Sequence, residues 1–126
     1  MTSAVTNIFE TSLSDVLNDF LKINNVLSAA IVGRDGFVIE SSSNIDVDAD
    51  ALGAMVATTI GTDENLGKEF KLGDIDHYLS EFSGGKILMS TVQEDILLVF
   101  TDADAVVGSV RYEIKKRLPK VLHILQ

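Results

Sequence analysis

Residues 26–43 constrain the fold more than any other stretch of the sequence, because they predict a β-hairpin with a strongly apolar first strand. Residues 26–32 are apolar except for Ser28. The dipeptide Asp35-Gly36 follows and favours a tight turn, because Gly tolerates positive φ and the Asp side chain bonds nearby backbone. Residues 37–40 predict the second strand. An isolated hairpin is at best marginally stable in water, so the other elements are expected to cover and extend it.

The length and composition favour one globular domain, which we expect to span residues 1–126 with its core in residues 11–118. Residues 1–10 are expected to form a loosely ordered leader. The sequence contains no apolar run near 18 residues and no basic segment before an apolar run at its start, which predicts neither insertion into a membrane nor a secretory signal. It also contains no Cys, which excludes disulfides and thiolate chemistry. These features favour a cytoplasmic location.

Charge is distributed unevenly along the chain, whose formal net charge is −9. Residues 1–110 contain 5 Lys and Arg against 18 Asp and Glu, whereas residues 111–126 contain 5 basic residues and 1 acidic residue. A nucleic-acid-binding protein needs a basic surface to neutralise phosphates. The acidic body of this chain therefore argues against a nucleic-acid partner.

Two helices are predicted before the last three strands. Ser12 and Asp15 resemble a capping box at the start of the first helix, whose apolar positions recur with helical spacing. The second helix should run from about residue 47 to residue 70, with Asp46 as its N-cap. The series Asp46, Asp48 and Asp50 also resembles a calcium loop, but its sixth and twelfth positions are Ala rather than Gly and Glu, so capping is the favoured interpretation.

The long second helix contains small residues at intervals of four. Gly53, Ala57 and Gly61 form this series, with Ala54 and Thr58 beside it. Glycine destabilises a helix interior by about 1 kcal/mol, so the series should have a packing reason. Close packing on the chain's own sheet and contact with a second chain are equally compatible with it. A break in the helix within residues 61–65 is a further alternative.

The remaining sequence predicts a β-meander, a final helix and an apolar tail. The strands are expected at residues 74–82, 86–92 and 96–100, with short turns between them. Asp102 or Asp104 should cap the last helix, Pro119 should end it, and residues 115–117 should place basic side chains in its last turn. Residues 119–126 form the tail, which is free to dock on its own sheet, cross to another protomer or bind a partner.

These elements predict an α/β domain with three layers, α/β/α, around a five-stranded, largely antiparallel sheet. The two unbroken apolar runs, residues 26–32 and 96–100, should be the central strands, which gives the order 2-1-5-4-3. The first and last helices should cover one face and the long helix the other.

The third strand becomes an edge strand that is unusually apolar. Unpaired edges favour pairing with another chain, so we predict a homodimer in which this strand and the long helix meet their symmetry mates. A monomer whose edge is masked by the tail is the alternative. The predicted dimer-interface residues are Gly53, Ala54, Ala57, Thr58, Gly61, His77, Tyr78, Leu79 and Ser80.

The order of these segments resembles the Roadblock/dynein light chain family, and within it the prokaryotic type that regulates small GTPases. The matching segments are AAIV at residues 29–32, Asp35-Gly36, VIES at 38–41, GGKI at 84–87, ILLV at 96–99, and Gly108 with Arg111 in the last helix. The resemblance covers about residues 11–118. It implies a profilin-like fold, dimerisation through the long helix and third strand, and a regulatory role as partner, and sometimes activator, of a Ras-like small GTPase.

No pattern in the sequence predicts a catalytic, cofactor-binding or metal site. It contains no Walker loop and no strand–GxGxxG–helix unit. His77 lies near Asp74 and Asp76, but on a strand it would point to the face opposite theirs, which argues against a metal cluster. The chain is therefore expected not to be an enzyme.

Two routes to GTPase activation remain open. The first is donation of an arginine finger, for which Arg34, Arg111 and Arg117 are the candidates, and the second is repositioning of the switch loops of the GTPase by contact alone. The second route is favoured, because Arg34 occupies an ordinary polar turn. Candidate partner-binding residues are Arg34, Arg111, Leu122 and Ile124. A nucleotide-independent scaffold subunit and a small-molecule-sensing domain are the alternative functions.

Overall fold

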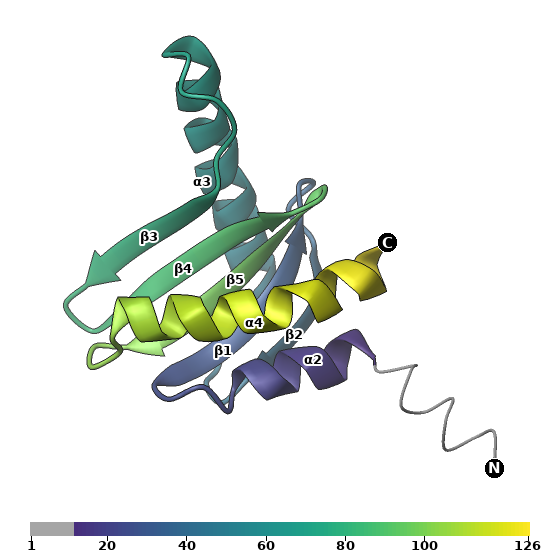
Figure 1. The fold of residues 1–126 in the computed structure, drawn as a ribbon, viewed down its shortest axis with the longest axis vertical. Helices are drawn as coiled ribbons and strands as arrows, with labels where there is room; N and C mark the ends of the chain where they lie inside the picture. Colours follow the sequence, from purple (N-terminus) through teal and green to yellow (C-terminus); the bar gives the residue numbers. More distant parts are fainter. Residues whose placement is uncertain (1–11) are drawn as a thin grey trace.

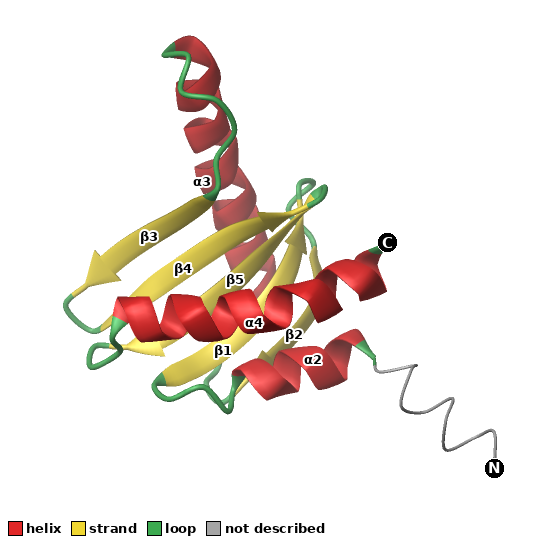
Figure 2. Ribbon diagram, in the orientation of Figure 1, coloured by secondary structure: helices red, strands yellow, loops and turns green. Residues whose placement is uncertain are grey.

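The structure is a computed structural model that describes residues 12–126, shown in Figures 1 and 2. The predicted leader lies outside the described residues. The elements are α2 (Leu13–Phe20), β1 (Val26–Gly33), β2 (Val38–Ser43), α3 (Ala49–Glu69), β3 (His77–Phe82), β4 (Gly85–Val92), β5 (Asp95–Asp102) and α4 (Val107–Leu125).

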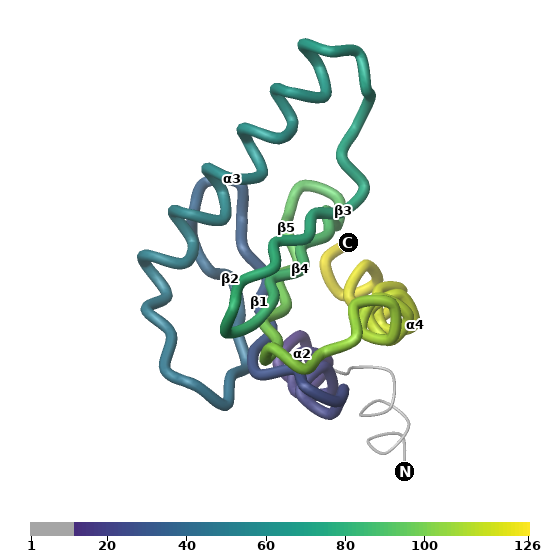
Figure 3. The backbone as a smooth tube through the Cα atoms, turned by 90° about the vertical axis from the view of Figure 1, so that its left-hand side faces the viewer, coloured from purple at the N-terminus to yellow at the C-terminus, as the bar shows by residue number. Residues whose placement is uncertain are grey.

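The five strands form one antiparallel sheet in the order β2-β1-β5-β4-β3, which confirms the predicted fold class and strand order. Ala30 pairs with Leu98, Leu98 with Met89, and Met89 with Tyr78, so these four side chains form a row on one face. Helix α3 lies on that face, while α2 and α4 lie on the other (Figure 3). Strand β3 is an edge, as predicted.

Local sequence signals account for the first helix and the hairpin. The hydroxyl of Ser12 accepts a hydrogen bond from the Asp15 N–H at 3.1 Å, and the Asp15 carboxylate accepts one from the Ser12 N–H at 3.3 Å. This confirms the predicted capping box. In the hairpin, Gly36 adopts a φ of 90° and its N–H donates to the Gly33 carbonyl at 3.0 Å. The turn therefore depends on the conformational freedom of Gly36.

Helix α3 is continuous and begins two residues later than predicted. Its N-cap is Asp48 rather than Asp46, and the Asp48 carboxylate accepts a hydrogen bond from the Ala51 N–H at 3.2 Å. No break occurs at residues 61–65. The helix ends where Lys71 takes a left-handed conformation, with φ of 56°, and the Leu72 N–H donates to the Gly67 carbonyl at 2.8 Å. The alternating Asp residues offer the same capping chemistry, so the sequence alone does not single out Asp48.

Helix α4 corrects two predictions and decides between the alternatives for the tail. Pro119 does not end the helix, which continues to Leu125. Proline removes one backbone hydrogen bond from a helix interior, but packing of the following turns offsets that loss, because Val121 is fully buried and Ile124 and Leu125 pack against the core. The tail thus docks on its own domain. As a result, residues 115–117 lie in the middle of α4 rather than in its last turn.

The N-terminus of α4 also differs from the prediction. Its N-cap is Val106, which makes no side-chain capping bond. Asp102 instead accepts hydrogen bonds from the Asp104 N–H at 2.9 Å and from the Asn25 side chain at 3.0 Å. Through these bonds, Asp102 holds the loop between β5 and α4 and links it to Asn25, directly before β1.

Strand β3 begins at His77, so Asp74 and Asp76 precede it.

The sheet separates two hydrophobic clusters of unequal size. The larger cluster lies between the sheet and α2 with α4, and its largest fully buried side chains include Leu17, Phe20, Ile31 and Leu97. The smaller one lies between the sheet and α3 and contains Ala30, Val32, Val56, Ile60, Met89, Ile96 and Leu98. Within residues 12–126, no helix is both long and apolar enough to cross a membrane.

Candidate interaction surfaces

The outer edge of β3 is the first candidate surface. In the described part of the chain, β3 pairs only with β4, so its other edge has no strand partner. His77 is exposed, and Tyr78, Leu79 and Ser80 are half-buried. Tyr78 and Ser80 lie on the α3 side of the sheet, whereas His77 and Leu79 lie on the α4 side. The four predicted edge residues are therefore brought together on one strand, with two on each face.

The small-residue series of α3 divides into two parts. Gly53 is buried against the hairpin, where a Cβ would overlap the Gly36 carbonyl oxygen. Close packing on the chain's own sheet therefore accounts for Gly53. Gly61 has no neighbouring atom within 4 Å of where its Cβ would be, Ala54 and Thr58 are exposed, and Ala57 is half-buried. These four positions remain available to a second chain.

The α3 face of the sheet is incompletely covered. Helix α3 contacts β1 and β2, and its C-terminal half projects beyond the sheet (Figures 1 and 3). Tyr78, Ile87 and Phe100, from β3, β4 and β5, are consequently half-buried at the margin of the smaller cluster. We call this region the open half of the sheet. Exposed apolar side chains continue along the helix and its end, namely Met55, Leu66, Phe70 and Leu72.

Two of the three candidate arginines are held in ion pairs. The Arg34 guanidinium, at the hairpin tip, pairs with Glu64 of α3. The Arg117 guanidinium contacts Asp19 at 3.0 Å and Glu113 at 2.7 Å, and its side chain is only 17% exposed. The hydrogen bond from Arg117 is the main reason why the pKa of Glu113 is lowered, and the nearby charges of Lys116 and Arg117 lower it further while burial acts in the opposite direction. Arg34 and Arg117 therefore join separate elements of this chain.

The two candidate residues of the C-terminal segment differ in their surroundings. Ile124 packs against the larger cluster, whereas Leu122 is 37% exposed. Both lie in the last turns of α4, on the face of the sheet opposite α3. They are thus not part of the surface formed by the β3 edge and the open half of the sheet.

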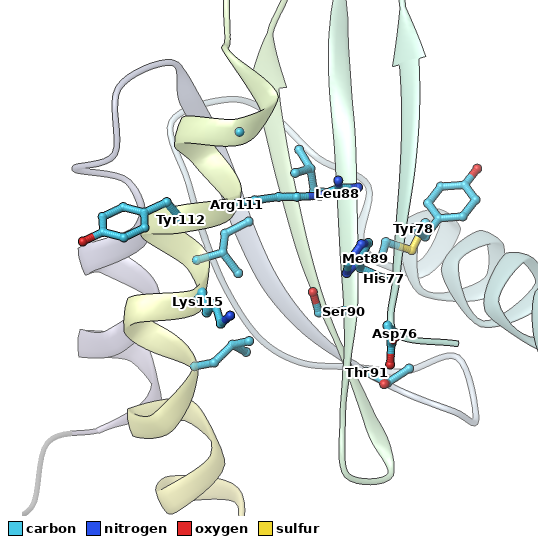
Figure 4. Close-up of a pocket in the computed structure, with 13 residues that line it drawn as sticks. Asp76, His77, Tyr78, Leu88, Met89, Ser90, Thr91, Arg111, Tyr112 and Lys115 are labelled. Carbon is cyan, nitrogen blue, oxygen red and sulfur yellow. The ribbon is translucent and has the colours of Figure 1, made fainter. Parts of the chain in front are cut away.

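Sequence reasoning missed a groove between α4 and the strands β3 and β4, shown in Figure 4. Arg111 and Lys115 line it from α4, and His77 and Ser90 line it from the strands. The one available signal was the spacing of Arg111 and Lys115, which places them one turn apart on the same side of a helix. Residues 12–126 contain no group of three His, Asp or Glu side chains arranged to hold a metal ion.

Comparisons with known proteins place the chain in a family. Residues 13–102 match the Roadblock/LC7 domain. The chain is 33% identical over 112 residues to Uncharacterized protein MJ0714 of Methanocaldococcus jannaschii, an alignment that covers 89% of this chain and 95% of the relative.

Solved structures share the fold at lower identity. Myxococcus xanthus MglB matches with a TM-score of 0.83 and 22% identity, covering 89% of this chain and 93% of MglB. A structure described as MglB with tetrameric arrangement gives 0.79 and 18%, covering 87% and 85%. Acanthamoeba castellanii profilin II gives 0.65 and 16%, covering 89% and 98%, which confirms the profilin-like architecture. The family match over residues 13–102 and the similarity to MJ0714 together establish that this chain belongs to the Roadblock/LC7 domain family.

Proposed function

We propose that this protein is a non-catalytic regulatory module that forms a homodimer and binds a Ras-like small GTPase in the cytoplasm. The observation that carries the proposal is the open half of the sheet, which lies beside the unpaired edge of β3. Family membership supports the regulatory role, because the prokaryotic type that the sequence resembles acts on such GTPases.

The proposed dimer joins two copies at β3, with their α3 helices adjacent. Pairing of β3 with its symmetry mate would satisfy the unpaired backbone groups of the edge and extend the sheet to ten strands. The α3 helix of the second copy would then cover Tyr78, Ile87 and Phe100, which α3 of the same chain leaves half-buried. Gly61 and Ala57 would permit close approach of the two helices. The solved tetrameric arrangement of MglB supports self-association of this fold.

We infer that any stimulation of GTP hydrolysis acts by positioning the switch loops of the GTPase. An arginine finger must be free to reach the transferred phosphate. Arg34 and Arg117 are each paired with carboxylates of their own chain, which favours contact with switch loops over a finger from either position. Arg111, which forms no ion pair within residues 12–126, is the one candidate finger left by this argument. The extended sheet and the paired α3 helices of the dimer would offer a broad area for such contact.

The dimer is tested by placing a charge at its proposed seam. Ser80→Lys brings two positive charges close together when two β3 strands pair. The matched control is Ser109→Lys, which adds the same charge at an exposed position of α4. Sedimentation velocity should show a dimer for the unmodified protein and for Ser109→Lys, and a shift towards monomer for Ser80→Lys. A dimer that persists unchanged in Ser80→Lys would reject β3 as the seam.

The GTPase partner is tested by affinity capture from lysate of the source organism, with a GTP analogue or GDP present and mass spectrometry as readout. Enrichment of a Ras-like GTPase with the GTP analogue supports the proposal and provides the substrate for a hydrolysis assay. A partner enriched equally in both states would indicate a nucleotide-independent scaffold instead. The absence of any GTPase in both samples would contradict the proposed partner.

A further inference from the structure

The groove between α4 and the strands β3 and β4 has the size and composition of a small-molecule site. The groove lies on the α4 face of the sheet. Helix α4 crosses β4, and the edge strand β3 lies beyond the helix, so the groove forms between them. Its volume is about 450 Å³, within the ~300–1,000 Å³ typical of small-ligand sites. The groove is therefore large enough for an organic molecule of about ten to twenty heavy atoms.

The groove combines an apolar floor with cationic groups. Leu88 of β4 and Ile114 and Leu118 of α4 provide the apolar part of the lining. Figure 4 shows Arg111 extending from α4 across the groove towards Leu88, with Lys115 on the next turn of the helix. Asp76 is the one carboxylate among the lining residues and lies beside Thr91 at the strand side.

Arg111 and Lys115 form no ion pair within residues 12–126, as is also true of Lys68, Lys71, Lys86 and Lys120, but only Arg111 and Lys115 line the groove. Lys22, Arg34, Lys116 and Arg117 each form an ion pair. Across residues 12–126, no carboxylate lies within 4.0 Å of Arg111 or Lys115, although the chain has 19 acidic residues and a net charge of −9. Arg111 is also half-buried, so the groove holds a partly desolvated guanidinium with free hydrogen-bonding capacity.

We propose that this groove binds a small organic anion, with a carboxylate or phosphate head group and an apolar body. The Arg111 guanidinium can donate two parallel hydrogen bonds to such a head group, and Lys115 adds a second positive charge one turn away. Leu88, Ile114 and Leu118 would contact the apolar body. A ligand with only one of these two parts would use half of the site.

This site lies mostly apart from the proposed dimer seam, with which it shares the β3 residues His77 and Tyr78. The dimer would use the outer backbone edge of β3 and the α3 side of the sheet, whereas the groove opens on the α4 side. A monomeric variant such as Ser80→Lys should therefore retain ligand binding. If no ligand binds, that result rejects the groove proposal alone. The proposed dimer and regulatory role would not be affected by it.

The experiment is a titration of the ¹⁵N-labelled full chain with defined probes, followed by NMR chemical-shift changes. The probes are 3-phenylpropanoate, its uncharged analogue 3-phenylpropanamide, phenyl phosphate, and acetate, which lacks the apolar body. We expect saturable shifts around residues 88–91 and 108–118 with 3-phenylpropanoate, at an affinity of about 1 mM for a ligand of this size. The amide and acetate should each bind at least ~10-fold more weakly. Comparison with phenyl phosphate decides which head group is preferred.

Matched variants assign the binding to the guanidinium. Arg111→Gln should weaken 3-phenylpropanoate binding ~10-fold or more, whereas Lys68→Gln, which removes the same charge from α3, should leave it unchanged. The ¹⁵N spectrum confirms that both variants are folded. Equal binding of the acid and the amide, equal binding by Arg111→Gln, or shifts confined to the exposed apolar residues of α3 would overturn the proposal. Shifts produced by an acidic peptide but by none of the small probes would also overturn it and identify a protein partner instead.

Discussion

The two faces of the sheet are covered to different extents. On one face, α2 and α4 lie side by side and close a core that includes Phe20, Ile31, Val99 and Val121 with almost no exposure. On the other face, α3 alone covers β1 and β2, and one side chain each of β3, β4 and β5, namely Tyr78, Ile87 and Phe100, stays half-buried. Both faces are built by the same five strands, so the difference arises from the helices.

The closed face therefore contributes mainly to the stability of the domain, and the open face to its proposed association with a second chain. The closed face supplies most of the fully buried large side chains, each of which contributes about 1.5–3 kcal/mol to folding. The open face retains apolar surface next to an unpaired edge, which a second chain would bury further. Variants on the two faces should therefore behave differently.

The largest effect is expected from Phe20→Ala on the closed face. Phe20 is fully buried between α2 and the sheet, so its removal leaves a cavity and should lower the free energy of unfolding by about 3–5 kcal/mol. Phe70→Ala, at a position 65% exposed, is the matched control and should change it by less than about 0.5 kcal/mol. Urea denaturation measures both. A large, concentration-dependent loss in Phe70→Ala would instead place Phe70 in an interface between copies.

A smaller effect distinguishes two glycines of the same helix. Gly53→Ala places a methyl group against the Gly36 carbonyl, which should cost about 1–3 kcal/mol of unfolding free energy. Gly61→Ala meets open space and should stabilise α3 by about 0.5–1 kcal/mol, because Ala loses less backbone entropy than Gly. Thermal unfolding at low protein concentration measures both changes. Equal destabilisation by the two substitutions would mean that both glycines serve the contact with the hairpin.

The ion pair between the hairpin and α3 should have a modest effect. Arg34→Ala removes this contact and Glu64→Gln removes its negative charge, so each should lower the free energy of unfolding by up to about 1 kcal/mol, as for other partly exposed pairs. Both variants should also leave GTPase stimulation within a few-fold of the unmodified protein. A loss near ~1,000-fold in Arg34→Ala alone, with Glu64→Gln active, would identify Arg34 as an arginine finger and reject the switch-loop route.

The smallest effect concerns the pH dependence of the closed face. The pKa of Glu113 is lowered mainly by its hydrogen bond from Arg117, so its ionised form stabilises the folded state. That contribution is fully present above the ordinary carboxyl pKa of about 4.3 and is lost as the pH falls through the lower folded value. The stability difference between the unmodified protein and Glu113→Gln should therefore shrink on acidification below about pH 4.3. Urea midpoints measured at pH 7 and pH 3.5 test this, and a difference that grows in acid would contradict it.

The sequence was sufficient for the architecture because its strongest signals are local and consistent. Two unbroken apolar runs identify the central strands, and Asp35-Gly36 fixes the hairpin between β1 and β2. Short turns then leave few alternatives for β3 and β4. The strand order follows from these constraints without knowledge of any long-range contact.

The errors and omissions arise where tertiary contacts decide the outcome. Pro119 usually ends a helix, but burial of Val121 outweighs its cost here. Gly53 and Gly61 are indistinguishable in sequence, and only the position of the hairpin assigns them different roles. The groove was missed because its lining comes from residues 76–91 and 108–118, which adjoin one another only in the folded domain.

The pairing of β1 with β5 has a consequence for how this chain folds. Val32 pairs with Ile96, which is 64 positions later in the sequence, so the centre of the sheet is closed by a contact of long sequence separation. Such contacts slow folding, because much of the chain must be ordered before they form. During synthesis at ~5–20 residues per second, the β1–β2 hairpin must therefore wait about 3–13 s for its central neighbour. Until β5 emerges, one edge of the strongly apolar strand β1 has no partner strand, which exposes the nascent chain to aggregation.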